Sequence, residues 1–478
     1  MDLPMTKPSL NPNKHLKEQF VSNLTGSSMP EIVALTVSVP VLVLIRHSIS
    51  SISIAGASLK KKNDDAPSGK RNFKSYLATL TLDFLVIVVP MLLFFTVLAN
   101  WTYIIACSLT ILTLLFISTK RSGGSSSFEG EPNSLRAYVT SYRVLVMIIT
   151  FLCILAVDFK IFPRRYAKTE TYGTSLMDLG VGAFVLANSL VSRQARNIAL
   201  VSWKTAVVST SPLILLGFLR LVTTTGVDYQ VHVGEYGVHW NFFFTLAAVS
   251  ILTSFINISP QYCGVIGSLL LVGYQFCLVQ GLNHYLLSDE RGVDILSQNK
   301  EGIFSIFGYW GMYLLGVYIG NSLIFGSHSS GFRSSRWVRM RVWALSILFW
   351  LLTVLLDRHV ERVSRRTCNL PYVTMVLADN LQLLSVLMLA DLVPGRKTSV
   401  LEEAFSRNLL ATFLLTSSVI IFLDNFVQAN ILTGLVNLSV DTLSASSIKA
   451  LIILLVYAYI LSIVIGILDY FGIKLKFW

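Results

Sequence analysis

Two residues of opposite charge, Asp158 and Lys168, have the types and spacing needed for proton transfer and for stabilising an oxyanion. Asp158 ends an uncharged apolar run, so we expect its carboxylate to be partly desolvated. Desolvation should raise its pKa, which suits a proton acceptor near neutral pH. Lys168 follows a bend at Pro163 and could fold back to stabilise an oxyanion or to pair with Asp158. The equal alternative is an ion pair at a helix end that takes no part in a reaction.

Three charged residues close to this pair are candidates for binding a substrate. Arg164 and Arg165 are adjacent, and arginine binds phosphate in a bidentate manner, so the two fit a phospholipid or CoA phosphate. The commoner alternative is that they extend to the membrane interface. Asp178 lies in the first turn of the next predicted helix, where its charge either binds substrate or stabilises the helix dipole.

Three further candidates stand later in the chain. Arg220 has apolar residues on both sides, so we expect it to face a cavity or a lipid phosphate. His239 and Asn241 begin a predicted helix, and His239 could act as a base or orient a hydroxyl group. An interfacial histidine beside an aromatic residue is an equal alternative for His239.

Transmembrane helices must position these residues. The chain has 478 residues, of which 53% are hydrophobic and 13% are charged, whereas a soluble domain carries about 25% charged residues. Because a span needs about 20 mostly apolar residues, we predict an all-α polytopic membrane protein without a soluble domain. The thirteen predicted spans are 30–46, 76–97, 101–118, 138–157, 175–192, 206–223, 240–258, 262–283, 303–325, 338–356, 370–390, 408–427 and 449–470. Residues 1–478 thus form one integral-membrane domain, with flexible cytosolic loops at 47–74 and 119–136.

The distribution of basic residues predicts the orientation in the membrane. One side holds loops 47–74, 119–136, 193–204, 333–341 and 396–407 and the C-terminus. That side carries about 23 of the 38 lysines and arginines, and is therefore predicted to be cytosolic. The net charge of +12 is spread over such loops, which indicates topology and anionic lipids rather than nucleic acid.

Two glycosylation sequons and a C-terminal signal agree with this orientation. Asn23 and Asn437 each begin a sequon on the predicted lumenal side. The tail 474–478 resembles a dilysine retrieval signal, which must be cytosolic to be read. Together these features predict a multi-pass protein of the endoplasmic reticulum membrane with a lumenal N-terminus and a cytosolic C-terminus.

Three other polar segments, 228–241, 283–302 and 357–372, fall on the same predicted face as Asp158, and they contain four of the seven histidines. Glu301, Arg365 and Arg366 lie in them as weaker candidates, for which a solvated loop is the better interpretation. The five cysteines have no metal-ligand spacing, so no metal site is expected. The chain has no Gly-x-Ser-x-Gly, Walker or His-Glu-x-x-His motif, which favours direct transfer to an activated hydroxyl over a covalent serine mechanism.

Four sequence blocks, at 156–182, 235–243, 299–305 and 364–372, closely resemble the signature of the inositol acyltransferases of GPI-anchor biosynthesis. This family includes the fungal GPI-anchored wall transfer proteins and their animal counterparts. The blocks occur in the family's order over nearly the whole chain. Lys160 stands where the family leads us to expect a proline, which makes the start of the loop less rigid and leaves Asp158 and Lys168 unchanged.

The resemblance implies thirteen spans and transfer of a fatty acyl group, typically palmitoyl, to the 2-hydroxyl of inositol in glucosaminyl-phosphatidylinositol. The donor is acyl-CoA, a co-substrate, and no other cofactor is expected. Asp158 and Lys168 match the proposed catalytic pair of the family. We therefore expect Asp158 to accept the hydroxyl proton, Lys168 to stabilise the thioester oxyanion, and the acyl chain to lie between apolar helices. The CoA group is expected to reach a basic cytosolic mouth.

The same resemblance suggests that Arg164 and Arg165 hold phosphate, while His239 and Asn241 help to orient the sugar and inositol. A rival interpretation is a transporter or flippase of an anionic lipid that uses the same basic loops without chemistry. Only an enzyme consumes acyl-CoA and adds mass to inositol. The sequence does not indicate the oligomeric state.

Overall fold

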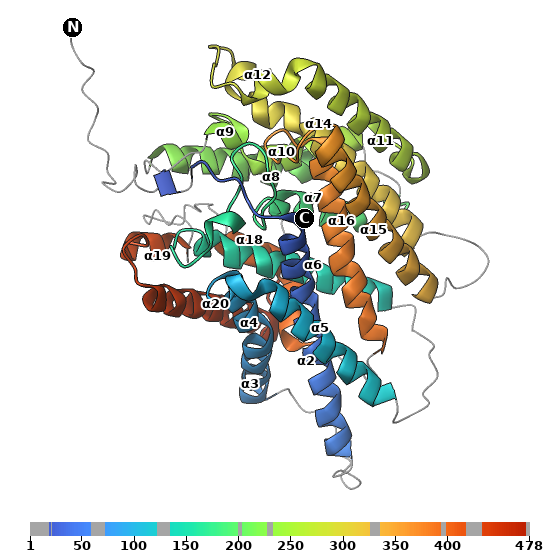
Figure 1. Cartoon of the computed structure of the whole chain (residues 1–478), viewed down its shortest axis with the longest axis vertical. Coiled ribbons are helices and arrows are strands. Elements are labelled where there is room, and N and C mark those ends of the chain that lie inside the picture. Colours follow the sequence, from blue (N-terminus) through green and yellow to red (C-terminus); the bar gives the residue numbers. More distant parts are fainter. Residues whose placement is uncertain are drawn as a thin grey trace.

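The computed structural model describes residues 19–20, 22–58, 72–121, 134–198, 203–226, 233–325, 335–392, 398–416 and 433–474. In these ranges the chain folds into helices, and β structure is limited to isolated bridges of Gly26 and Ser27 with Thr174. Figure 1 shows a bundle of long helices in which segments far apart in sequence lie side by side. The predicted all-α polytopic fold is therefore confirmed.

Nine helical segments of the described chain are long and apolar enough to cross a membrane. They confirm nine of the predicted spans. The helices that form them are α2 (Met29–Ser58), α3 (Phe73–Asp83) with α4 (Val89–Phe95), α5 (Thr102–Arg121), α6 (Ser134–Ala156), α11 (Pro260–Cys277) with α12 (Asn283–Leu287), α14 (Lys300–Ile319), α15 (Ser335–His359), α16 (Leu370–Leu387) and α20 (Ser447–Tyr470).

The other four predicted spans have a described apolar helical stretch that is shorter than a full membrane span. Three of them correspond to shorter apolar helices: α7 (Leu179–Leu190), the middle of α8 (Trp203–Gly226) and α10 (Phe242–Ile256). The span at 408–427 is described only as α18 (Leu409–Thr416), because 417–432 lie outside the described residues. The described chain therefore does not confirm the count of thirteen. The remaining short helices are α9 (Val233–Tyr236), α13 (Ile295–Gln298), α17 (Val400–Arg407) and α19 (Thr433–Ser439).

The two predicted cytosolic loops are described only at their edges. Helix α2 continues to Ser58, so the first part of the predicted loop 47–74 is helical rather than a loop. Residues 59–71 and 122–133 lie outside the described chain, as do residues 475–478 of the predicted retrieval signal. The predictions made for those residues stay predictions.

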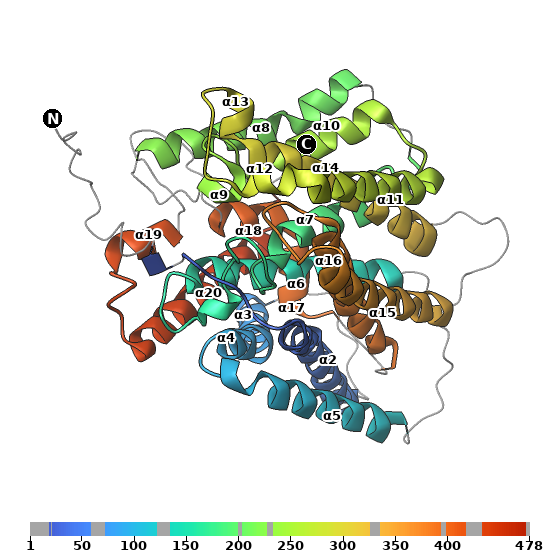
Figure 2. The ribbon, with the colours of Figure 1, turned by 45° about the horizontal axis from the view of Figure 1, so that its top comes forward.

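Helix α16 lies at the centre of the fold. Asn369 caps its N-terminus by accepting a hydrogen bond from the backbone N–H of Tyr372, and Pro371 occupies the first turn, where no N–H is needed. All of its residues except the first are buried. Figure 2 shows α16 between α15, α14, α7, α6 and α2, and it packs against each of them. This helix therefore gives the surrounding loops a common support.

The described contacts gather the polar segments that were predicted to share one face. Lys168 pairs with Glu235, and Arg366 pairs with Glu301, although each pair joins segments more than 60 residues apart. We call this end of the bundle the Asp158 end. The predicted grouping is confirmed, whereas the compartment that this end faces stays a prediction.

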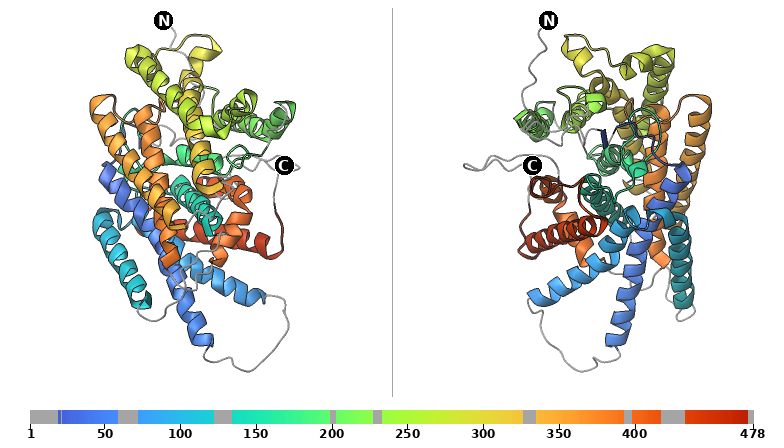
Figure 3. Two further views of the ribbon diagram at one scale, coloured as in Figure 1. Left: turned by 90° about the vertical axis from the view of Figure 1, so that its right-hand side faces the viewer. Right: turned by 60° about the vertical axis from the view of Figure 1, so that its left-hand side comes forward.

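A second set of ion pairs marks the opposite end of the bundle. Arg46 pairs with Asp83, and His47 lies 2.8 Å from Glu402, so the second half of α2 meets the C-terminal end of α3 and the first turn of α17 there. Figure 3 shows that the C-terminal end of α2 and helix α12 lie at opposite ends of the molecule. These contacts agree with the predicted division of the loops into two faces.

Candidate active site

The loop between α6 and α7 carries Asp158 and Lys168 and is packed into the protein. Phe159, Phe162 and Tyr166 of this loop are fully buried. The guanidinium Nη2 of Arg164 donates hydrogen bonds to the carbonyl oxygens of Val157 at 2.8 Å and of Phe162 at 2.9 Å. Burial lowers the pKa of Arg164 to about 10, although the nearby Asp158 opposes this change. Arg164 therefore stabilises the conformation of the loop and binds a carbonyl oxygen at the C-terminal end of α6.

The segment before α2 crosses this loop at two glycines. The backbone N–H of Ser27 donates a 2.6 Å hydrogen bond to the carbonyl oxygen of Thr174. Gly26 and Gly173 have φ angles of 82° and 134°, and a Cβ at either would lie within 2.3 Å of a carbonyl oxygen of the other segment. Only glycine fits such positions without strain. The crossing fixes the second half of the loop, after Lys168.

Asp158 and Lys168 line the same cavity, which has a volume of about 830 Å³. Its apolar wall comes from α6, α7, α10, α16 and α18. Its charged wall comes from the loops at the Asp158 end and from α8 and α9. The apolar wall includes Val146, Ile149, Ile154, Ala183, Phe184, Phe242, Phe243, Leu383 and Phe413, and the charged wall includes Asp158, Lys168, Arg220, Glu235, Arg291, Arg365 and Arg366.

Lys168 is held by a chain of ion pairs. Its Nζ atom lies 2.7 Å from Oε1 of Glu235, and Nη1 of Arg365 lies 3.1 Å from the same oxygen. The Nε atom of Arg365 lies 2.9 Å from Oδ1 of Asp178, which is fully buried. Burial alone would raise the pKa of Glu235, but Lys168 and Arg365 outweigh it and lower this pKa to about 2. Glu235 therefore stays ionised and keeps Lys168 directed to one place.

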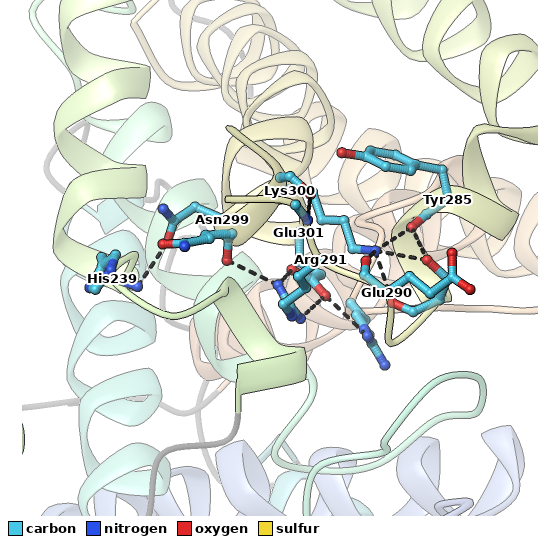
Figure 4. A network of polar contacts seen from close by, with 12 residues as sticks. His239, Tyr285, Glu290, Arg291, Asn299, Lys300 and Glu301 are labelled. Carbon is cyan, nitrogen blue, oxygen red and sulfur yellow. Dashed lines mark hydrogen bonds and ion pairs between the residues drawn. The ribbon is translucent and has the colours of Figure 1, made fainter. Parts of the chain in front are cut away.

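A second network joins the loop before α14 to the same cavity (Figure 4). Glu301 is buried and pairs with Arg291 at 2.6 Å and with Arg366 at 3.0 Å. Lys300, which is also fully buried, donates hydrogen bonds to four oxygens of the loop, among them the carbonyl of Tyr285. The segment before α14 is thus folded around the ammonium group of Lys300. This conformation of the segment places Arg291 beside Glu301.

These networks correct one interpretation of the sequence. Glu301, Arg365 and Arg366 were better explained as a solvated loop, but all three are buried and ion-paired. Their partners lie 10 to 187 residues away along the chain. Local sequence carries no sign of such pairing, so the burial of these three residues could not be predicted from the sequence.

The adjacent arginines, Arg164 and Arg165, point to different partners. Arg165 lies 2.9 Å from Glu31 and donates a hydrogen bond to Asn100, whereas Arg164 binds carbonyl oxygens of its own loop. Neither belongs to the residues that line the cavity. Their predicted role in phosphate binding stays a prediction, and both have structural contacts of their own.

The side chain of Asn241 makes structural contacts, whereas the contact of His239 is made by its backbone. The backbone N–H of His239 donates to Oδ1 of Asn299, and the exposed histidine does not line the cavity (Figure 4). Asn241 does line the cavity, but its side chain caps α10 and donates a 2.9 Å hydrogen bond to the carbonyl oxygen of Gly217 in α8. Arg220 lines the cavity, and its charge contributes to the low pKa of Glu235.

Sequence reasoning missed two contributors from the helices. Asp379 and Asn380 lie in the middle of α16 and line the cavity. Thr36 donates a 2.7 Å hydrogen bond to Asp379, and Tyr142 donates a 2.8 Å hydrogen bond to Asn380. A carboxylate inside an apolar span marks a functional candidate, and this signal could have identified Asp379.

Asn437 in α19 is a further missed residue. Its Nδ2 atom donates a 2.9 Å hydrogen bond to Oδ2 of Asp158. From the sequence alone, Asn437 is visible only as a glycosylation acceptor. The contact with the proposed proton acceptor gives it a place in the site.

The fold and the cavity define an integral-membrane protein with a site for a ligand that is partly charged and partly apolar, as lipids are. The chain belongs to the GWT1 family, whose sequence model matches residues 13–468. The resemblance drawn from the sequence blocks is therefore confirmed.

Individual relatives match most of the chain. An uncharacterized protein of Arabidopsis thaliana is 56% identical over 443 residues, which cover 91% of this chain and 98% of the relative. GPI-anchored wall transfer protein 1 of Aspergillus oryzae is 37% identical, covering 97% of this chain and 99% of its own. Phosphatidylinositol-glycan biosynthesis class W protein of Dictyostelium discoideum is 37% identical, covering 72% of this chain and 76% of its own.

Proposed function

We propose that this protein transfers a fatty acyl group, typically palmitoyl, from acyl-CoA to the 2-hydroxyl of inositol in glucosaminyl-phosphatidylinositol. The reaction would be a step of GPI-anchor biosynthesis at the endoplasmic reticulum membrane, with the N-terminus lumenal and the C-terminus cytosolic. Membership of the GWT1 family and the names of its relatives support this assignment. The single observation that carries it is the position of Asp158 and Lys168 in one cavity with an apolar wall.

In the proposed reaction the inositol hydroxyl attacks the carbonyl carbon of the thioester. Asp158 accepts the hydroxyl proton as the new C–O bond forms, and the carbonyl oxygen gains the negative charge. When the intermediate collapses, the C–S bond breaks and the thiolate of CoA leaves. The proton on Asp158 can then pass to that thiolate, which restores the carboxylate.

Lys168 suits the role of stabilising the oxyanion, since a fixed positive charge lowers the energy of the intermediate most when it needs no rearrangement. Glu235 supplies that fixation, because it is ionised and lies 2.7 Å from Nζ. The side chain of Lys168 remains 40% exposed, which leaves part of the ammonium group open to a substrate. A neutral partner in place of Glu235 would hold it less firmly.

The charged wall of the cavity suits the phosphate of the acceptor lipid. Arg220, Arg291 and Arg366 line the cavity, and arginine is well suited to phosphate. Arg164 and Arg165 lie outside that wall. The fourth cavity arginine, Arg365, is paired with both Asp178 and Glu235, so the geometry favours the other three for this role. The acyl chain would lie against the apolar surface that α6, α7, α10 and α18 provide.

The purified protein with labelled palmitoyl-CoA and glucosaminyl-phosphatidylinositol tests this proposal. The expected result is labelled lipid whose mass has increased by one palmitoyl group on inositol, together with one free CoA thiol for each product. A well-folded protein that gives no such product, yet moves the lipid between the leaflets of a vesicle, would replace the acyltransferase with the flippase.

A further inference from the structure

We propose that Asn437 is a positioning residue for Asp158, and that its side chain is unmodified in the active protein although it begins a glycosylation sequon. The role assigned to Asp158 belongs to the proposed function, so this inference rests on it. The state of the Asn437 side chain can be measured independently of activity.

The first observation is the contact itself. Asn437 lies 279 residues from Asp158 in the chain, yet its Nδ2 atom donates a 2.9 Å hydrogen bond to Oδ2 of the carboxylate. An ionised carboxylate has only acceptor atoms, so the amide must present its nitrogen and not its oxygen. The orientation of the side chain is therefore determined by Asp158.

The second observation concerns the other end of the amide. The Oδ1 atom of Asn437 is buried and has no hydrogen-bond partner in the described part of the chain. A buried carbonyl oxygen without a partner destabilises a fold, and an asparagine with a purely structural role would be expected to use both ends. In the described residues the side chain of Asn437 thus makes its polar contact with the proposed proton acceptor.

The contact has a chemical consequence for Asp158. A hydrogen bond donated to a carboxylate favours the ionised form, which is the form that can accept a proton. It also limits rotation of the carboxylate, so the group keeps one orientation towards the cavity. Among the described residues, Arg164 is a charged group close enough for Asp158 to raise its pKa, and it is bound to carbonyl oxygens of the loop, while Lys168 lines the same cavity. Asn437 therefore supports the base without adding another charge.

The third observation separates the two predicted sequons. Asn23 is exposed, whereas the side chain of Asn437 is partly buried against Asp158. A glycan is attached at Nδ2, the atom that Asn437 directs to Asp158. A bulky sugar at that atom is incompatible with the contact, so we expect Asn437 to be unmodified.

Two variants separate the side chain from the sequon. Asn437→Leu removes the amide and keeps a similar size, whereas Ser439→Ala removes the sequon and keeps Asn437. For each we would measure kcat/KM against pH with palmitoyl-CoA and glucosaminyl-phosphatidylinositol. Loss of the amide donor should shift the acid limb of the kcat/KM profile of Asn437→Leu to higher pH. The expected shift is about one pH unit, given the strength of a hydrogen bond to a charged group. The KM for palmitoyl-CoA should not change, and Ser439→Ala should match the wild type.

Three results would overturn the inference: an unchanged pH profile in Asn437→Leu, an equal defect in Ser439→Ala, or a glycan on the peptide that contains Asn437. If Asn437→Leu does not fold, Asn437→Gln decides, because it keeps the amide but displaces it and should show a smaller shift of the same limb. An inactive wild-type protein would contradict the proposed function instead. Mass spectrometry of the Asn437 peptide would still test the unmodified side chain in that case.

Discussion

The Nζ atom of Lys168 and the Oε1 atom of Glu235 lie 2.7 Å apart, and Arg365 binds the same carboxylate oxygen. The lysine proposed to stabilise the oxyanion is therefore fixed by α9 and by the segment before α16, not by its own loop. Since Arg365 also pairs with Asp178 at the start of α7, one buried arginine links three elements around the site.

Replacing Lys168 with methionine should lower kcat by about 10²- to 10³-fold, the typical effect of removing one oxyanion donor. The KM for acyl-CoA should change little, because the charge acts on the intermediate rather than on the bound thioester. Steady-state kinetics of Lys168→Met measure both values. Lys160→Met is the matched control, as Lys160 is an exposed lysine of the same loop and should retain wild-type kinetics. A normal rate in Lys168→Met would remove the oxyanion role.

Replacing Glu235 with glutamine should lower kcat by roughly tenfold or more, since a hydrogen bond to a charged group is lost and Lys168 is held less firmly. The pKa of Glu235 is lowered to about 2, so this carboxylate stays ionised and is neutralised only as the pH falls towards that value. The acid limb of the wild-type activity profile near neutral pH should therefore come from another group. A pH–rate profile of Glu235→Gln should show a lower plateau with the limb in the same place. Disappearance of the limb would identify Glu235 as the titrating base.

Replacing Arg365 with glutamine should destabilise the protein strongly. It leaves the buried Asp178 without its guanidinium and removes one of two cations from Glu235. Breaking a buried ion pair on one side typically costs about 3–5 kcal/mol. The thermal midpoint of Arg365→Gln in detergent should fall, and the double variant Arg365→Gln/Asp178→Asn should recover part of the loss. A midpoint equal to that of the wild type would show that the pair contributes nothing to stability.

Two glycines of α7 should respond in opposite ways to alanine. A Cβ at Gly182 would lie 2.7 Å from a methyl group of Val376 and 3.2 Å from the hydroxyl of Tyr372, both in the central helix α16. Gly182→Ala should therefore cost about 1–3 kcal/mol through overpacking. A Cβ at Gly180 meets nothing within 4 Å, so Gly180→Ala should be neutral or stabilise the helix by up to about 1 kcal/mol. Thermal unfolding of the two variants measures this difference in stability. Equal midpoints for the two variants would show that α7 and α16 pack more loosely than described.

Much of the architecture could be predicted from the sequence. Apolar runs are visible directly, so the nine long spans and the division of polar loops into two groups were found. Asp158 and Lys168 could be singled out because charges of both signs interrupt an apolar stretch, and both line the cavity. The lengths of α7 and α10 were overestimated, because hydropathy does not show where a helix ends inside a bundle. Asn241, for example, is a cap that ends an irregular segment.

The partners of the charged residues could not be predicted. Glu235 lies in a recognised block, but its contacts with Lys168 and Arg365 span 67 and 130 residues. Arg164 and Arg165 are neighbours in sequence and yet turn to separate partners, one to backbone carbonyls and one to Glu31. Such choices depend on tertiary packing, which decides whether a charge is buried and what lies beside it.

The most direct test of the account compares wild-type protein with Asp158→Asn in the transfer of labelled palmitoyl from palmitoyl-CoA to glucosaminyl-phosphatidylinositol. Asparagine keeps the size of the side chain at the end of α6 but cannot accept the proton of the inositol hydroxyl. The account predicts labelled inositol-acylated lipid from the wild type and a rate lowered at least 10²-fold in Asp158→Asn, with unchanged thermal stability and unchanged binding of both substrates. Wild-type turnover in Asp158→Asn would contradict it and would reduce Asp158 to a partner of Asn437 without a role in the chemistry.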